Sequence, residues 1–367
     1  MPSSPKILSR YLAWSYLGHF LGLLFVLLAI VYMLDTIELL RRAVKRDDVP
    51  VLLVLQMGLF KLPEVGQIIL PFAILFSAMY TFWALSRRYE LAVIRAAGLS
   101  VWQFLMPVLA VAFTCGLLSA MVVNPLGAMF ISKFEQYETR YLGTQRNLVS
   151  VFEDGFWIRQ PSGTAESDVI LNADRVILQD WTFQRVMGLA FDSEGSLVSR
   201  LDAERARLGD GEWVFENVHI TNRLRENYYR DEYRLPTEMT RQDIEDSFAS
   251  PETIPFWFIP EYIDILDKTG FDSTRLKIHF HHLLSMPVIF TAMIFLAAAV
   301  ALRPPRSGRT ILLIAAGVAI GILFFFLSSY VQALGASQQI PPVLAAWAPA
   351  VIAFLLGLTA LLSLEDG

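Results

Sequence analysis

The chain has 367 residues, a formal net charge of −5 and 54% hydrophobic residues. That hydrophobic fraction exceeds the fraction typical of a soluble globular domain, and the charge balance gives no basic surface of the kind that binds nucleic acid. The single cysteine, Cys115, lies in an apolar stretch, so disulfides cannot hold a soluble part together.

Six uncharged runs, three toward each end of the chain, are long enough to cross the hydrocarbon core of a bilayer as α-helices. Since backbone groups cannot stay unpaired in lipid, we predict helices over residues 11–34, 65–86, 99–132, 283–302, 310–334 and 341–364. The first run has the basic start of a signal peptide, but it is too long and no cleavage site follows it. We therefore expect a retained membrane anchor.

This pattern predicts a polytopic α-helical membrane protein with six transmembrane helices in a 3 + 3 arrangement and an inserted antiparallel β domain. We expect helices one to three within residues 1–135, the β domain within 136–275, and helices four to six within 276–367. A short cytoplasmic helix is expected near residues 87–98, between helices two and three.

Basic residues gather on the side of the membrane that carries both termini. Six spans place the termini together, and the positive-inside bias places that side in the cytoplasm. The residues that decide this orientation are Lys6, Arg10, Arg87, Arg88, Arg95, Arg303, Arg306 and Arg309. The β domain is then expected in the periplasm of a Gram-negative cell, and the chain in its inner membrane.

One predicted outer loop departs from this bias, because Arg41, Arg42, Lys45 and Arg46 follow the first span. An exposed amphipathic turn explains them without a function. Alternatively, they form a basic collar at the outer mouth of a path for an anionic amphiphile. Glu38 lies close to the membrane boundary, where charges are costly and often functional, or reach water by snorkelling. The candidate substrate-binding residues are therefore Glu38, Arg41, Arg42 and Lys45.

The loop between spans two and three is rich in helix formers and ends at Gly98. Ser100 and Gln103 have the spacing of a capping box for span three. The predicted short helix either lies among lipid headgroups, where its arginines meet anionic lipid, or docks a cytoplasmic protein. The residue pattern leaves both interpretations open.

Residues 148–223 change to a period-two pattern, with short apolar segments separated by Asp/Gly turns. This spacing predicts an antiparallel sandwich or open roll, with Trp157, Trp181 and Trp213 in its core. Farther on, Pro260 suits a helix start and Gly270 a helix stop, which predicts a short amphipathic helix leading back to the membrane.

No sequence pattern for a hydrolase nucleophile or a metal centre is present, so neither a catalytic nor a metal site is expected. His219 is expected on a strand or at the surface. His279, His281 and His282 precede the fourth span, where interfacial placement is preferred over a metal site.

The chain has no G-x-x-x-x-G-K-[ST] motif and cannot hold ATP through its own P-loop. Transport would need either a separate ATPase or an ion gradient. The centres of predicted spans two to six hold no acidic or basic residue, and His19 is the remaining ionisable candidate in span one. This pattern disfavours ion coupling. An ion-coupled transporter and a non-transport sensor or scaffold with a periplasmic binding domain remain the alternatives.

Four motifs carry a resemblance to a known family. They are Ile7-Leu-Ser-Arg-Tyr-Leu, Leu62-Pro-Glu with Ile69-Leu-Pro-Phe, the segment from Arg88 to Ser100, and Gly270-Phe-Asp with Arg275 and Pro287. Across essentially its whole length the chain resembles the LptF/LptG permeases, the membrane subunits of the ATP-driven lipopolysaccharide exporter. Gln339-Ile-Pro-Pro-Val, followed by Pro349, is more similar to the G-type subunit than to the F-type.

The resemblance implies a permease with a periplasmic β-jellyroll that extracts lipopolysaccharide and passes it to a periplasmic bridge. It implies an F-type permease partner in a heterodimer, two copies of a cytoplasmic ABC ATPase and a single-span periplasmic bridge protein. No cofactor would bind this chain directly, because ATP and Mg would lie on the ATPase. Arg41 and Arg42 match residues that meet the phosphates of lipid A. ATPase coupling is assigned to Arg87, Arg88, Tyr89, Glu90, Leu91, Ile94 and Arg95.

Overall fold

The computed structural model describes residues 6–44, 49–142, 149–152, 155–160, 168–177, 180–192, 196–209, 211–222, 227–237, 239–240, 244, 250–302 and 310–365. The chain divides into two compact units, each described by itself below. The helical unit comprises residues 1–142, 252–257 and 274–367, and the β unit comprises 143–251 and 258–273.

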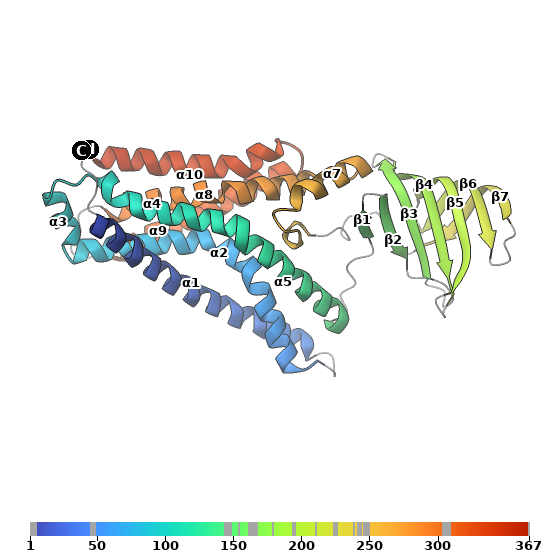
Figure 1. The fold of residues 1–367 in the computed structure, drawn as a ribbon, viewed down its shortest axis with the longest axis horizontal. Helices are drawn as coiled ribbons and strands as arrows, with labels where there is room; N and C mark the ends of the chain where they lie inside the picture. The colour runs from blue at the N-terminus through green and yellow to red at the C-terminus, as the bar shows by residue number, and fades with distance from the viewer. Residues whose placement is uncertain are drawn as a thin grey trace. The chain divides into compact units, whose positions relative to one another are not determined.

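The helical unit contains the six predicted spans, which confirms the fold class. Within the described residues, six helical segments are long and apolar enough to cross a membrane. They are α1 (Lys6–Ala43), α2 (Val51–Arg87), a third span over Val101–Leu142, α8 (Thr274–Ala301), α9 (Thr310–Ala336) and α10 (Pro342–Glu365). The short helix α3 (Glu90–Ala96) joins the second and third spans, at the end of the bundle where α1 begins and α10 ends (Figure 1).

The first three spans are longer than their apolar runs predict. At 1.5 Å per residue they measure about 55–65 Å, against about 30 Å of hydrocarbon. Their extra turns pack on one another, far from α3, in a hydrophobic cluster formed by Leu39, Ala43, Val54, Met57, Ile131 and Phe134. Hydropathy does not detect this three-helix extension, because exposed polar residues interrupt its apolar runs while its apolar residues are buried between the helices.

The third span is irregular where it meets the rest of the helical unit. It runs from α4 (Val101–Leu118) through a π-helical turn, Ser119–Val123, into α5 (Asn124–Tyr137) and a second π-helical turn, Glu138–Leu142. Asn124 is buried, and its Oδ1 accepts a hydrogen bond from the backbone N–H of Phe256 at 2.9 Å. The π-helical turn and this bond fix the segment that leaves the bundle at residue 257.

The β unit is an antiparallel meander. Within the described residues, seven strands form one sheet in the order of the sequence, β1-β2-β3-β4-β5-β6-β7. They are β1 (Val149–Phe152), β2 (Gly155–Gln160), β3 (Asp168–Ile177), β4 (Thr182–Phe191), β5 (Leu197–Leu208), β6 (Glu212–Asn222) and β7 (Asn227–Pro236). The antiparallel β domain expected from the period-two pattern is therefore present.

The sheet curls, because strands far apart in its order are tied together. Gln160 of β2 donates to the carbonyl of Pro236 in β7 at 2.9 Å and accepts from Trp213 Nε1 of β6 at 3.1 Å. The Phe183 ring lies 5.4 Å from that of Phe156 and 5.0 Å from that of Trp213. These contacts across the concave face make the unit an open roll with an aromatic core.

Two of the three tryptophans predicted in this core are buried there, and the third is not. Trp181 is 6% exposed and Trp213 is 1% exposed, whereas Trp157 is only half-buried. In β2 the neighbouring residues, Phe156 and Ile158, point to the core. Because side chains alternate between the faces of a strand, Trp157 must point to the other face. The prediction that Trp157 belongs to the core was therefore wrong, because its neighbours in β2 face the core instead.

The pairing of neighbouring strands is interrupted at one level from β3 to β7. Asp174, Arg185, Glu204, Asn217 and Asp231 are skipped in the pairing of successive strands. Arg185 and Asn217 have positive φ values of 51° and 55°. The register is the same on both sides of the skipped residues, so no strand carries an extra residue at this level.

Helix α7 (Ile259–Thr269) packs on β3 within the β unit. It starts with Pro260 in its first turn and ends at Gly270, which has a φ of 88°, as the sequence predicts. Beyond the glycine, the Phe271 ring lies 4.9 Å from the Phe156 ring at an interplanar angle of 86°. The glycine stop thus directs the next residue into the aromatic core.

Candidate functional site

Helix α1 buries side chains against the helical unit near its two ends, and in its middle it contacts α2 only through partly exposed residues such as Tyr32. Near the α3 end, Leu12, Tyr16 and Phe20 form a buried stripe at spacings of four residues. Near the other end, Thr36, Leu39 and Ala43 are buried. Between residues 21 and 35 no described side chain is buried, so this part of α1 offers a surface for lipid or another chain.

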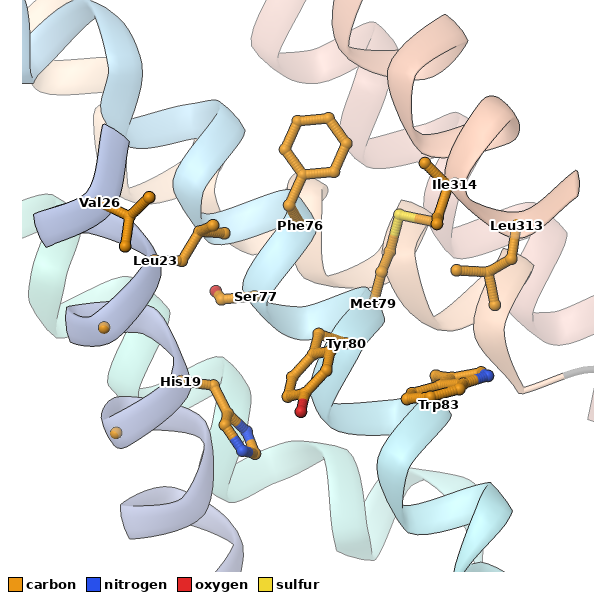
Figure 2. A pocket seen from close by; sticks show the side chains of 12 residues that line it. His19, Leu23, Val26, Phe76, Ser77, Met79, Tyr80, Trp83, Leu313 and Ile314 are labelled. Carbon is orange, nitrogen blue, oxygen red and sulfur yellow. The ribbon is translucent and has the colours of Figure 1, made fainter. Parts of the chain in front are cut away.

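An apolar groove of about 680 Å³ runs beside residues 18–26 of α1. Figure 2 shows its walls, with His19, Leu23 and Val26 facing Phe76, Tyr80 and Trp83 across the space. The full lining is Gly18, His19, Gly22, Leu23 and Val26 of α1, Phe76, Ser77, Met79, Tyr80 and Trp83 of α2, and Leu313 and Ile314 of α9. Groove walls of this kind suit acyl chains, which gain free energy by leaving water.

The groove has one ordered polar position on α1. His19 Nδ1 lies 2.9 Å from the hydroxyl oxygen of Thr81, and that hydroxyl donates its proton to the carbonyl of Ser77 at 2.7 Å. Because a hydroxyl has one proton, His19 Nδ1–H must be the donor to Thr81. The ring of His19 also meets the Tyr80 ring edge-on at 4.8 Å. Contacts within the chain therefore hold the His19 ring in one orientation, and a bound ion is not required to explain that orientation.

At the far end of α1 the structure gathers three of the four predicted substrate-binding residues. Glu38 Oε1 accepts from Arg41 Nη2 at 2.8 Å and from Arg42 Nε at 3.1 Å. Arg42 Nη1 also lies 3.6 Å from Oε1 of Glu138, which is 9% exposed. Lys45 lies outside the described residues. The two guanidinium groups are thus exposed, held beside each other, and partly neutralised by carboxylates.

Two charged residues of α2, Lys61 and Glu64, were not among the predicted site residues. Lys61 Nζ lies 3.4 Å from Asp35 Oδ2, joining the two helices. One turn away on α2, no described group hydrogen-bonds to the buried Oε2 of Glu64. Both α2 residues precede the apolar run from which the second span was predicted. Hydropathy therefore did not include them in the second helix, although Glu64 stands in the Leu62-Pro-Glu motif.

The predicted coupling segment turns sharply and then forms α3. Tyr89 has a φ of 61°, which ends the course of α2, and Glu90 begins the new helix. Leu91 and Ile94 are each 7% exposed and pack into the helical unit, whereas Tyr89 is 74% exposed and Val93 68%. Only one side of α3 is therefore open to a partner.

The charged residues of this segment with described side chains are at least partly exposed, and they also contact other parts of the helical unit. The Arg87 guanidinium lies 5.2 Å from the Trp83 ring centroid, a cation–π distance. Arg88 Nη1 lies 4.0 Å from Glu90 Oε1, and the hydroxyl of Tyr11 donates to Glu90 Oε2 at 3.0 Å. Arg95 belongs to α3, but its side chain is not described. Tyr11 was not among the predicted site residues, because the chain separates it from Glu90.

The capping box that precedes the third span is confirmed. Ser100 Oγ accepts from the Gln103 N–H, and Gln103 Oε1 accepts from the Ser100 N–H. It fixes where α3 ends and α4 starts. In the described part of the chain, no group of three or more His, Cys, Asp or Glu side chains could hold a metal ion.

A family model described as "Lipopolysaccharide export system permease LptF/LptG" matches residues 10–363 of the chain. The chain belongs to the LptF/LptG family. It is 22% identical to the LptG protein of Haemophilus influenzae over 94% of this chain and 95% of that protein. It is 21% identical to the LptG protein of Escherichia coli over 96% and 97% of the two chains.

Membership in the LptF/LptG family agrees with what the four motifs predicted, and both relatives are G-type subunits. The chain is thus a membrane-spanning permease of a lipopolysaccharide export system. In this permease α1 provides one wall of the groove and carries the arginine pair. Residues 21–35 of α1, none of which is buried, are a part that a lipid or a second permease can reach.

Proposed function

We propose that this chain extracts lipopolysaccharide from the inner membrane as the G-type half of an ATP-driven exporter and passes it toward a periplasmic bridge. The observation that carries the proposal is the combination on α1 of an apolar groove and a terminal arginine pair. A phosphorylated glycolipid has the matching chemistry, because acyl chains fill apolar space and phosphates accept charge-assisted hydrogen bonds.

Family membership supports a second permease, an F-type homologue, as the partner. In α1 only 11% of the most apolar segment is buried within this chain, and in α9 only 17%, against 72% in α8. These two helices are therefore the faces that a partner would cover. In this proposal the groove is one wall of a vestibule that the F-type subunit completes.

Energy would come from two copies of a separate cytoplasmic ATPase, which bind ATP and Mg in place of any cofactor on this chain. The positive-inside bias places α3 in the cytoplasm and the arginine pair at the periplasmic side. The exposed side of α3, with Tyr89 and Val93, is the surface offered to the ATPase. Closure of the ATPase would move α3, narrow the vestibule and drive lipid toward the β unit and a single-span bridge protein.

The first test is purification of the chain from its own membrane in mild detergent, with mass spectrometry of proteins and bound lipid. We expect a homologous permease, a P-loop ATPase and lipopolysaccharide to be recovered together. Recovery of the chain with neither ATPase nor glycolipid would contradict the proposal and favour a sensor or scaffold.

Replacing Glu90 with Lys is expected to reduce lipopolysaccharide-stimulated ATP hydrolysis of the assembled exporter by about tenfold. The change reverses the charge at the first position of α3, where the helix dipole favours an acid, and so disturbs the helix that faces the ATPase. The rate is measured on complexes matched for subunit content. Arg10→Glu, a charge reversal at an exposed residue of α1, is the control. Normal stimulation in Glu90→Lys would contradict a coupling role for Glu90.

Replacing Glu38 with Gln is expected to strengthen the binding of phosphorylated lipid by about threefold. The carboxylate competes with phosphate for Arg41 and Arg42, and a neutral amide competes less well. The loss of an exposed ion pair costs little stability. Binding of a fluorescent lipopolysaccharide to the permease in nanodiscs measures the change, with a dephosphorylated lipid as the control. Equal strengthening for both lipids would show that phosphate is not the group held.

A further inference from the structure

Tyr11, near the start of α1, contacts the coupling helix directly. Its hydroxyl donates to Glu90 Oε2 at 3.0 Å, across 79 residues of chain. The other carboxylate oxygen faces Arg88 at a looser 4.0 Å. A hydrogen bond to an ionised acceptor is roughly twice as strong as one between neutral groups. Tyr11 thus joins α1 to α3 by a side-chain hydrogen bond.

Helix α3 depends on such contacts for its position. It has seven residues, which is too short to be stable by itself in water. The positive φ of Tyr89 separates it from α2, so that it is not a rigid continuation of that helix. Among the described side chains of α3, the buried Leu91 and Ile94 pack into the helical unit, and Glu90 accepts the hydrogen bond that joins α3 to α1.

Helix α1 can carry a displacement from one end of the bundle to the other. It is continuous over 38 residues, about 57 Å, with no proline to bend it. Tyr11 adjoins Leu12, the first residue of the buried stripe, and the groove and the arginine pair lie farther along the same helix. A shift of the first turns of α1 would therefore change the groove without any contact between α3 and lipid.

We propose that Tyr11 is a positioning residue, which transmits movement of α3 to α1 through Glu90 and so sets the groove in step with the ATPase. This inference rests on the proposed exporter function and deepens it. In this proposal the carboxylate of Glu90 links α3 to α1 within the permease, while the exposed side of α3 contacts the ATPase.

The test uses the complete exporter, assembled with the second permease and ATPase of its own system in lipid nanodiscs that contain rough-type lipopolysaccharide. ATP hydrolysis and lipopolysaccharide release are measured on the same sample. For Tyr11→Phe, which keeps the ring and removes the hydroxyl, we expect ATP hydrolysis within twofold of wild type. Lipopolysaccharide released per ATP should fall about fivefold, the scale of the net contribution of one hydrogen bond, because this bond is exposed to water.

Two further variants separate transmission from a structural role. Trp14→Phe changes an exposed aromatic residue one turn farther along α1 and should keep the wild-type ratio of release to hydrolysis. In a Glu90→Ala background, which has no side-chain acceptor for the Tyr11 hydroxyl, Tyr11→Phe should cause less than a twofold further change, because the two residues act through one bond. Hydrogen exchange of residues 6–16 should rise in Tyr11→Phe.

Three results would overturn the role of Tyr11. The first is an unchanged ratio of lipopolysaccharide release to ATP hydrolysis in Tyr11→Phe, and the second is an equal fall of hydrolysis and release. The third is a double variant in which the effects of the two substitutions on this ratio multiply as if they were independent. A parallel fall would mark a merely structural residue. If the wild-type exporter hydrolyses ATP but releases no lipopolysaccharide, the proposed function itself fails. That outcome is distinct from a wild type that works and a Tyr11→Phe variant that works equally well.

Discussion

Removing the arginine pair, by Arg41→Ala with Arg42→Ala, is expected to weaken the binding of phosphorylated lipopolysaccharide between ten- and a hundredfold. Each guanidinium offers several donors to a phosphate, and a charge-assisted hydrogen bond contributes about 1.5–3 kcal/mol when it is sheltered from water. Both side chains are more than half exposed, which places the expected effect at the lower end. Titration of the nanodisc-embedded permease with labelled lipopolysaccharide measures the loss.

The single variants distinguish binding from stability. Arg42 is close to the buried Glu138, so Arg42→Ala leaves a carboxylate with less compensation and should also destabilise the three-helix extension. Arg41→Ala leaves that contact in place and should weaken binding with no loss of thermal stability.

Arg10→Ala is the matched control, since Arg10 is an exposed arginine at the opposite end of the same helix. It should bind lipopolysaccharide as wild type does. Equal weakening by Arg10→Ala and Arg41→Ala would mean that general attraction to the anionic lipid, not the arginine pair, holds the phosphate.

Replacing Gly270 with Ala is expected to destabilise the β unit by about 3 kcal/mol or more. A left-handed residue with a side chain costs about 1–2 kcal/mol, and the φ of Gly270 is 88°. The new Cβ would also meet the carbonyl oxygen of Val176, a backbone atom that cannot turn aside. The end of α7 must then move away from β3, and Phe271 must withdraw from the ring of Phe156. The rate of thermolysin cleavage within residues 149–273 of the full chain measures this loss.

Gly211→Ala separates the two causes. Gly211 belongs to the same unit and has a φ of 82°, but its added Cβ would come no closer than 3.9 Å to another backbone atom. Its substitution carries the conformational cost alone and should destabilise the unit by about 1–2 kcal/mol. If both variants are cleaved at the same rate, the clash with Val176 is relieved at no cost and the packing of α7 on β3 is looser than described.

The sequence by itself determined the features that depend on neighbouring residues. A span must satisfy its backbone hydrogen bonds within one helix, so the six apolar runs located the six spans without any knowledge of their packing. The Ser100 capping box and the Gly270 stop are fixed by residues within one turn, and both were predicted correctly. Alternation of side chains identified the antiparallel β domain for the same reason.

The tertiary structure alone decided which distant residues meet. No local pattern relates Tyr11 to Glu90 or Asp35 to Lys61, because these pairs form only when separate helices pack. The groove needs walls from α1, α2 and α9, and the curl of the roll needs Gln160 of β2 to reach β7, five strands away. Hydropathy also made the first three spans too short, since it detects only uninterrupted apolar runs. Outside those runs, apolar residues such as Leu39 and Phe134 are buried by neighbouring helices, and only packing shows where those helices begin and end.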